Sequence, residues 1–114
     1  MRQGRQVFLA SLLLCGMLFT ACSMHEPIGT IIADPGRYQN QEVAVAGTVT
    51  ESYGVLETGA YELDDGTGKI WVITNRGVPS RGAHIGATGR LHTAFSMGGR
   101  SFGTVLEESA RRAR

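Results

Sequence analysis

The chain has 114 residues, with 11 Lys and Arg against 10 Asp and Glu, and its formal net charge is +1. This near-neutral balance excludes the strong electrostatic attraction that marks most nucleic-acid-binding domains. The length allows one small domain with a modest core.

The first 21 residues have the pattern of a secretory signal peptide. Arg2 and Arg5 form a charged start, and residues 7–19 are an apolar run. This run is short for a transmembrane helix, which needs about 20 apolar residues. We therefore expect residues 1–21 to be removed, which leaves 9 basic residues, after the loss of those two arginines, against 10 acidic ones. The alternative is a marginal membrane anchor that stays attached.

The end of this segment resembles the lipobox of bacterial lipoproteins. Thr20, Ala21 and Cys22 match that motif, whereas Phe19 stands where the family usually has an aliphatic residue. The resemblance implies that Cys22 is lipidated and becomes the mature N-terminus, and that Ser23 allows sorting to the outer membrane, facing the periplasm. The alternative is an ordinary thiol after ordinary signal cleavage.

Residues 22–34 are expected to form the lipidated N-terminus, a tether and one short helical turn. Three isoleucines share one helical face and are expected to pack on the domain: Ile28, Ile31 and Ile32. The turn should end at Asp34, because the residue before a proline avoids the helical region. Tyr38 is expected to fold onto the same core.

Five short strands are predicted after this turn. The first, at residues 41–51, alternates valine with small or polar residues around Gly47, and a glycine inside a strand indicates a bulge or a bend. Residues 61–74 predict a hairpin with one buried face around the turn Asp64-Asp65-Gly66-Thr67-Gly68. The last two strands are predicted at residues 83–91 and 101–106, and loops at residues 52–59, 75–82 and 93–100.

No segment is long enough to supply the helix that joins parallel strands. Short strands and glycine-rich turns therefore predict an all-β barrel or sandwich. Glycines at strand bends favour a small, strongly coiled barrel. Residues 109–114 contain three arginines and are expected to be a solvated basic tail.

The strands also resemble those of bacterial OB-fold (oligonucleotide/oligosaccharide-binding) domains. The matching patterns are V-x-V-x-G-x-V at residues 43–49, D-x-T-G-x-I-x-V at residues 65–72 and a G-x-V-like step at residues 89–91. The resemblance covers roughly residues 35–108 and implies a five-stranded Greek-key barrel. Many such domains have a helix between the third and fourth strands, but here we expect a loop. The resemblance indicates a fold and leaves the function open.

Trp71 is the first candidate for ligand binding. If Ile70 and Val72 point inward, Trp71 points outward on the third strand, where ligands usually lie on OB-type barrels. An exposed aromatic ring there can stack on a base or a sugar. The alternative is that Trp71 packs beneath a loop or the N-terminal turn.

Further surface candidates come from loops and strands near Trp71. Candidate cations are Lys69, Arg76 and Arg90, opposed by the carboxylates of Glu62 and Asp64. The loop candidates are Tyr53, Phe95, Met97 and Arg100. The alternative for the two loop aromatics, Tyr53 and Phe95, is that they close the ends of the barrel.

No group of residues predicts catalysis, a cofactor or a metal site. Residues 99–103 match the hydrolase pattern G-x-S-x-G, but the strand, turn and helix of that motif are missing. Asp64 and Asp65 are better explained by a turn than by a cation site.

We therefore expect a non-enzymatic lipoprotein of the cell envelope, whose barrel binds a protein, an envelope polymer or a small ligand. The alternative is that the face of the second and third strands binds single-stranded nucleic acid or an oligosaccharide. Nucleic-acid binding would depend steeply on salt.

Overall fold

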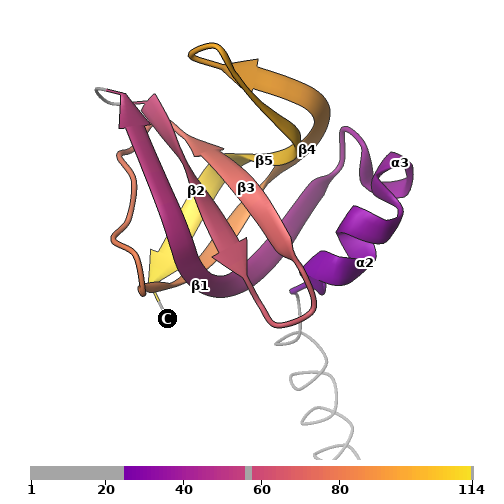
Figure 1. Cartoon of the computed structure of the whole chain (residues 1–114). Coiled ribbons are helices and arrows are strands. Elements are labelled where there is room, and N and C mark those ends of the chain that lie inside the picture. The colour runs from indigo at the N-terminus through magenta and orange to yellow at the C-terminus, as the bar shows by residue number, and fades with distance from the viewer. Residues whose placement is uncertain (1–24, 56–57, 114) are drawn as a thin grey trace, which may run out of the picture.

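A computed structural model of the chain describes residues 25–55 and 58–113. The predicted signal peptide and Cys22 lie outside the described residues. Five strands form a closed barrel, and two short helices lie beside it (Figure 1). The predicted fold class, an all-β, small five-stranded OB-type Greek-key barrel with a short N-terminal helical turn, is confirmed, and the helical part consists of two short helices.

The helices precede the strands along the chain. They are α2 (Ile28–Ala33) and α3 (Pro35–Tyr38). The strands are β1 (Glu42–Val55), β2 (Thr58–Asp64), β3 (Lys69–Thr74), β4 (His84–Met97) and β5 (Arg100–Ala113). Their order in the barrel is β1-β2-β3-β5-β4, and β4 pairs with β1 to close the ring. Neighbouring strands are antiparallel except for β3 and β5, which are parallel.

β1, β4 and β5 are longer than predicted. The loops expected at residues 52–59 and 93–100 are instead mostly strand. Only Gly98 and Gly99, with φ of 60° and 78°, turn β4 into β5, because glycine adopts this backbone conformation without a steric clash. The loop expected at residues 75–82 is confirmed, and it contains no helix.

The register of β1 with β2 shifts between Val49 and Glu51, two residues after Gly47, where the sequence predicted a bulge or a bend. Residues 42–48 pair with β4, whereas residues 48–55 pair with β2. A Cβ atom on Gly47 would lie 2.7 Å from the carbonyl oxygen of Asp64. This close approach of β2 therefore requires a residue without a side chain at Gly47, next to the point where β1 passes from pairing with β4 to pairing with β2.

The N-terminal segment docks on the barrel before the first helix begins. The Glu26 N–H donates to the Ala44 carbonyl oxygen at 2.8 Å. Ile28 and Ile31 of α2 are fully buried in the core. Ile32 is 41% exposed, so its predicted packing on the domain is wrong. The reason is that α2 contacts the barrel through the side shared by Ile28 and Ile31.

A second short helix follows where the sequence predicted the helical turn to end. Pro35 is the first residue of α3. Proline suits that position because its missing N–H would have no partner there. Tyr38 packs against the core as predicted.

The turn between β2 and β3 holds α2 in place. Asp65 Oδ2 accepts the Ile28 N–H at 2.9 Å, and Thr67 Oγ1 accepts the Gly29 N–H at 2.9 Å. Asp65 Oδ1 accepts the N–H groups of Thr67 and Gly68. Burial raises the pKa of Asp65, but these donors outweigh it and hold that pKa below its ordinary value of 3.8. The predicted turn role of Asp65 is confirmed.

A buried polar network joins β2, β3 and β5. The Glu108 carboxylate, whose side chain is fully buried, accepts hydrogen bonds from the Tyr61 hydroxyl and from Thr74 Oγ1. Arg111 Nε donates to Glu108 Oε2 at 2.9 Å, and Arg111 Nη2 donates to the Gly77 carbonyl oxygen at 2.7 Å. Arg111 is therefore part of the barrel, and the expectation of a solvated basic tail is wrong for it.

The network keeps the Glu108–Arg111 pair charged. Burial raises the pKa of Glu108, but the Arg111 guanidinium and the two hydroxyl donors outweigh it, so that pKa lies below its ordinary value. Burial lowers the pKa of Arg111, but Glu108 raises it by more. Burial and the Glu108 carboxylate both raise the pKa of Tyr61, which therefore remains a protonated donor.

Replacement of Glu108 by glutamine should lower the free energy of unfolding by about 3 kcal/mol, because the Arg111 guanidinium then loses its carboxylate partner. Equilibrium urea unfolding at neutral pH measures this loss. Glu107→Gln is the matched control: its side chain is 61% exposed and lies 3.4 Å from His92, so the expected change is less than about 1 kcal/mol.

The loss of unfolding free energy in Glu108→Gln should also depend on pH. The lowered pKa of folded Glu108 makes its contribution complete above the ordinary value of 4.5, and the contribution disappears as the pH falls through the folded value. The difference in stability between the wild type and Glu108→Gln should therefore shrink from about pH 5 to about pH 3. A constant difference over that range would contradict this account of the network.

Candidate ligand-binding site

A second apolar cluster lies on the outer side of the barrel, separate from the core. Its half-buried members are the rings of Tyr53, Trp71 and Phe95, and its buried members are Ala60, Ile73, Phe102 and Val105. We call the four rings together with Arg100 the aromatic face. The members come from β1, β2, β3, β4 and β5.

Strand alternation places this cluster outside the barrel. On β3, Ile70 and Val72 belong to the core, whereas Trp71 and Ile73 belong to the outer cluster. Trp71 pairs with Val105 of β5. The outward direction predicted for Trp71 is therefore correct. The sequence predicted only one buried face for this hairpin, but part of its outer face is buried as well.

The β4–β5 hairpin extends above the ends of β2 and β3 (Figure 1), and it contributes Phe95 and Phe102 to the outer cluster. A bulge begins it, since the register shifts between His92 and Phe95. Ala94, in the bulge, has φ of 56°, a left-handed conformation that costs a non-glycine residue about 1 kcal/mol. At the tip, a Cβ atom on Gly98 would lie 3.1 Å from the Tyr53 hydroxyl. The hairpin thus reaches across to β1.

Three of the four rings of the aromatic face lie close to one cation. The centroids of Trp71 and Phe102 are 5.0 Å apart in an edge-to-face arrangement, and those of Tyr53 and Phe102 are 6.3 Å apart. The Arg100 guanidinium carbon lies 5.0 Å from the Trp71 ring, 5.1 Å from Phe102 and 5.8 Å from Tyr53. Both geometries are favourable, because ring edges and cations are attracted to the negative faces of aromatic rings.

The structure brings together four of the residues singled out in the sequence, namely Tyr53, Trp71, Phe95 and Arg100. Trp71 is half-buried beneath the hairpin. It therefore points outward, as predicted, and it also packs under another segment, which was the alternative. Phe102 was missed as a site residue. Its position between small residues at the start of a predicted strand gave no sign that it would cover Trp71.

The other candidate cations lie elsewhere. Lys69 is on the outer side of β3 but at its turn end, opposite Asp64. Arg76 donates to a carbonyl oxygen of β5 at 2.8 Å. Arg90 donates to the Asn40 carbonyl oxygen at 3.0 Å. The structure does not bring these three cations to the aromatic face. The side chain of Met97 is not among those that the structure describes.

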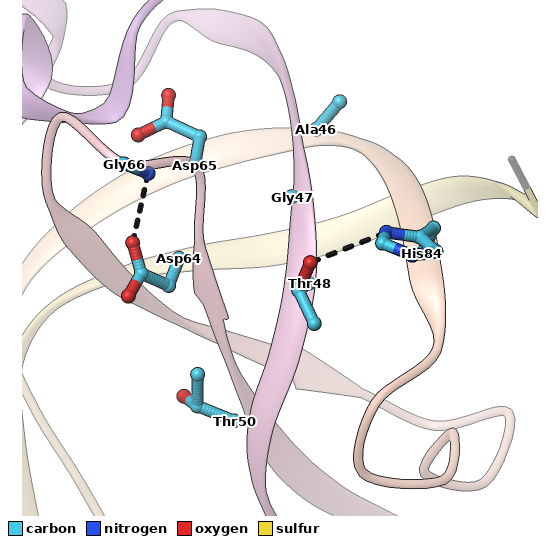
Figure 2. A pocket seen from close by; sticks show the side chains of 8 residues that line it. All are labelled: Ala46, Gly47, Thr48, Thr50, Asp64, Asp65, Gly66 and His84. Atoms are coloured by element: carbon cyan, nitrogen blue, oxygen red, sulfur yellow. Dashed lines mark hydrogen bonds between the residues drawn. The ribbon is translucent and has the colours of Figure 1, made fainter.

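An open, shallow groove runs along β1 beside the β2–β3 turn (Figure 2). Its lining residues are Ala46, Gly47, Thr48, Thr50, Asp64, Asp65, Gly66 and His84. His84 Nδ1 and Thr48 Oγ1 are 3.2 Å apart, and Asp64 Oδ1 accepts the Gly66 N–H at 2.8 Å. The groove is therefore polar and uncharged on its β1 wall and acidic on its turn wall.

Carboxylates separate the groove from the aromatic face. Glu62 is opposite Trp71 on one side and opposite Glu51 on the other. Glu62 Oε1 is held by the Thr50 hydroxyl at 2.7 Å. These two carboxylates make the surroundings of Trp71 favourable for cations and unfavourable for phosphates.

Within residues 25–55 and 58–113 there is no group of three or more His, Cys, Asp and Glu side chains that could hold a metal ion. The helices described in these ranges are also too short to cross a membrane.

No protein-family model and no curated protein matches this chain. Solved structures match it in fold. One is the OBody AM3L09 bound to hen egg-white lysozyme, with 19% sequence identity and a TM-score of 0.54; the match covers 68% of this chain and 84% of that one. Another is described as an aspartyl-tRNA synthetase from Leishmania major Friedlin, with 11% identity and a TM-score of 0.62; the match covers 81% of this chain but 21% of that one. At these identities the likeness shows the fold alone.

Replacement of Phe102 by alanine should uncover Trp71. The expected results are a red shift of the Trp71 emission, stronger quenching by acrylamide and a loss of about 3 kcal/mol in the free energy of unfolding. Trp71 is the only tryptophan of the chain, so the emission has one source. Tyr38→Ala is the control, because Tyr38 packs on the barrel core and should lower stability without moving the emission. An unchanged Trp71 spectrum in Phe102→Ala would contradict the described packing.

Proposed function

We propose that this chain is a non-enzymatic, lipid-anchored protein of the bacterial cell envelope, whose barrel binds a protein, an envelope polymer or a small ligand through the aromatic face. The observation that carries the proposal is the gathering of Tyr53, Trp71 and Phe95 on the outer side of the strands, with Arg100 among them. Large aromatic side chains and arginine are the residues that contribute most to binding in protein interfaces.

The position of the aromatic face also supports a binding role. Ligands of OB-type barrels commonly lie on the outer side of the second and third strands and against the loop between the fourth and fifth. Here that loop is the β4–β5 hairpin, which supplies Phe95, Arg100 and Phe102. The similarly folded OBody is bound to a protein, hen egg-white lysozyme, so this fold can present a surface to a protein partner.

The charges favour this proposal over nucleic-acid binding. Glu62 lies opposite Trp71, with Glu51 next to Glu62 on β1, and Asp64 lies opposite Lys69, the only lysine of the sequence. A phosphate backbone needs a row of cations, with affinity that falls steeply as salt rises. Oligonucleotides should therefore leave the Trp71 emission unchanged, even at low salt.

The lipid anchor rests on the lipobox-like sequence that ends at Cys22. One lipidated cysteine followed by a short tether would hold the barrel at a membrane surface without a transmembrane helix. The barrel would face the periplasm, on the inner side of the outer membrane.

Expression of the full chain in a bacterium with a labelled fatty acid should give a labelled protein. Cys22→Ser should lose the label and leave the membrane fraction. Cys15→Ser is the matched control and should keep both the label and the membrane location, because Cys15 lies within the apolar run of the signal. Equal labelling of wild type and Cys22→Ser would refute the anchor.

Binding through the aromatic face is tested by photo-crosslinking in the envelope. A benzophenone-bearing phenylalanine in place of Phe95 should form adducts of higher mass, because Phe95 lies on the proposed face. Protease sensitivity would identify a protein partner, and sensitivity to a glycan hydrolase would identify a polymer. The same group in place of Tyr38, which packs on the barrel core from α3, is the control. No adducts from position 95, or equal adducts from both positions, would refute the proposed face.

A further inference from the structure

The arrangement of Arg100 among three rings indicates more than a structural contact. Its guanidinium carbon is within 5.8 Å of the ring centroids of Tyr53, Trp71 and Phe102. The rings therefore form a cage around one cation, and such cages are a recurring way in which proteins recognise cationic ligands.

Arg100 is held weakly in this cage. The residue is exposed, and among the ion pairs of residues 25–55 and 58–113 none includes it. This contrasts with Arg111, whose guanidinium also lies over a ring, that of Tyr61 at 5.2 Å, but has a carboxylate and carbonyl partners. Within the described ranges, rings rather than carboxylates therefore hold the Arg100 guanidinium.

Negative charge next to the cage favours a cation from outside as well. Glu62 is opposite Trp71, and Glu51 is opposite Glu62. The Glu62 carboxylate is oriented by the Thr50 hydroxyl at 2.7 Å. An incoming guanidinium therefore meets aromatic faces on one side and carboxylates at the rim, a combination that suits a charged, planar group.

We propose that the cage formed by the rings of Tyr53, Trp71 and Phe102 is a receptor for an arginine side chain of a partner protein, and that Arg100 occupies this receptor in the free chain. This inference rests on the proposed binding function and names its ligand chemistry. The seated Arg100 shows that the cage has the size and charge for a guanidinium. Arg100 lies at the first position of β5, directly after the Gly98–Gly99 turn, so its side chain can leave without unfolding a strand.

Occupation by Arg100 should weaken binding of an external arginine. When a side chain of the protein fills a site, an external ligand binds only while the site is empty. The apparent affinity is therefore the intrinsic affinity multiplied by the fraction of time for which the site is empty. With cation–π contacts to three rings, that reduction should be roughly tenfold. Removal of the Arg100 guanidinium should therefore strengthen the binding of an external guanidinium.

The test measures Trp71 emission of the purified full chain in detergent while acetyl-arginine methylamide is added. Arg100→Ala should bind saturably, with a dissociation constant roughly tenfold below that of the wild type. Arg100→Gln, which keeps a long polar side chain without the charge, should behave in the same way. Acetyl-glutamine methylamide is the ligand control and should not bind.

Several results would overturn the inference. They are no saturable binding by Arg100→Ala, equal affinities of wild type and both variants, or equal binding of the glutamine compound. Equal affinity for tetramethylammonium would show a site for any cation and would refute the assignment to arginine.

A second measurement uses the wild type, in case the variants fail to fold. The Nε–H resonance of Arg100 should be shifted by the surrounding rings, and addition of acetyl-arginine methylamide should move it toward its value in an unfolded chain. A resonance that stays fixed at saturating ligand would refute displacement. Failure of this inference is distinguishable from failure of the proposed function, because crosslinks from position 95 would still form with a partner that presents no arginine.

Discussion

The structure depends on one strand of the barrel, β3, which packs against other residues on both of its faces. Ile70 and Val72 fill the barrel, while Trp71 and Ile73 pack outward against β5 and its hairpin. A strand covered on both sides cannot slip in register without exposing apolar side chains to water. The parallel pairing of β3 with β5 therefore sets where the hairpin begins, and the hairpin in turn determines the shape of the outer surface.

Much of the barrel was predictable because the inner face has a clear period of two. Val43, Val45 and Val49 alternate with small or polar residues, and Gly47 marks the close approach of β1 to the end of β2. The outer cluster was harder to predict, because Ala60, Phe102 and Val105 are buried in a cluster whose other members come from distant parts of the chain. Their burial is determined by tertiary contacts, which the alternation of apolar and polar residues along a strand does not indicate.

The buried network around Glu108 and Arg111 was also not predictable from the local sequence. Arg111 stands in a short run of arginines, and such a run at a chain end usually points to solvent. Its burial depends on Glu108, three residues earlier, and on Tyr61 and Thr74 from two other strands. Strand pairing over long distances in the chain brings these groups together. The same pairing puts Arg76 and Arg90 away from Trp71, which their charge alone could not indicate.

If Cys22 is lipidated as proposed, the docking of the N-terminal segment limits how far the barrel can stand from the membrane. Glu26 is already hydrogen-bonded to Ala44 of β1, so only the four peptide units from Cys22 to Glu26 would separate the anchor from the folded domain. Fully extended, four residues span at most about 14 Å. With the proposed anchor, a barrel held this close to a lipid surface would search for partners in two dimensions, and their effective concentration would be raised without any additional contact. Even a weak receptor for a single side chain would then be occupied.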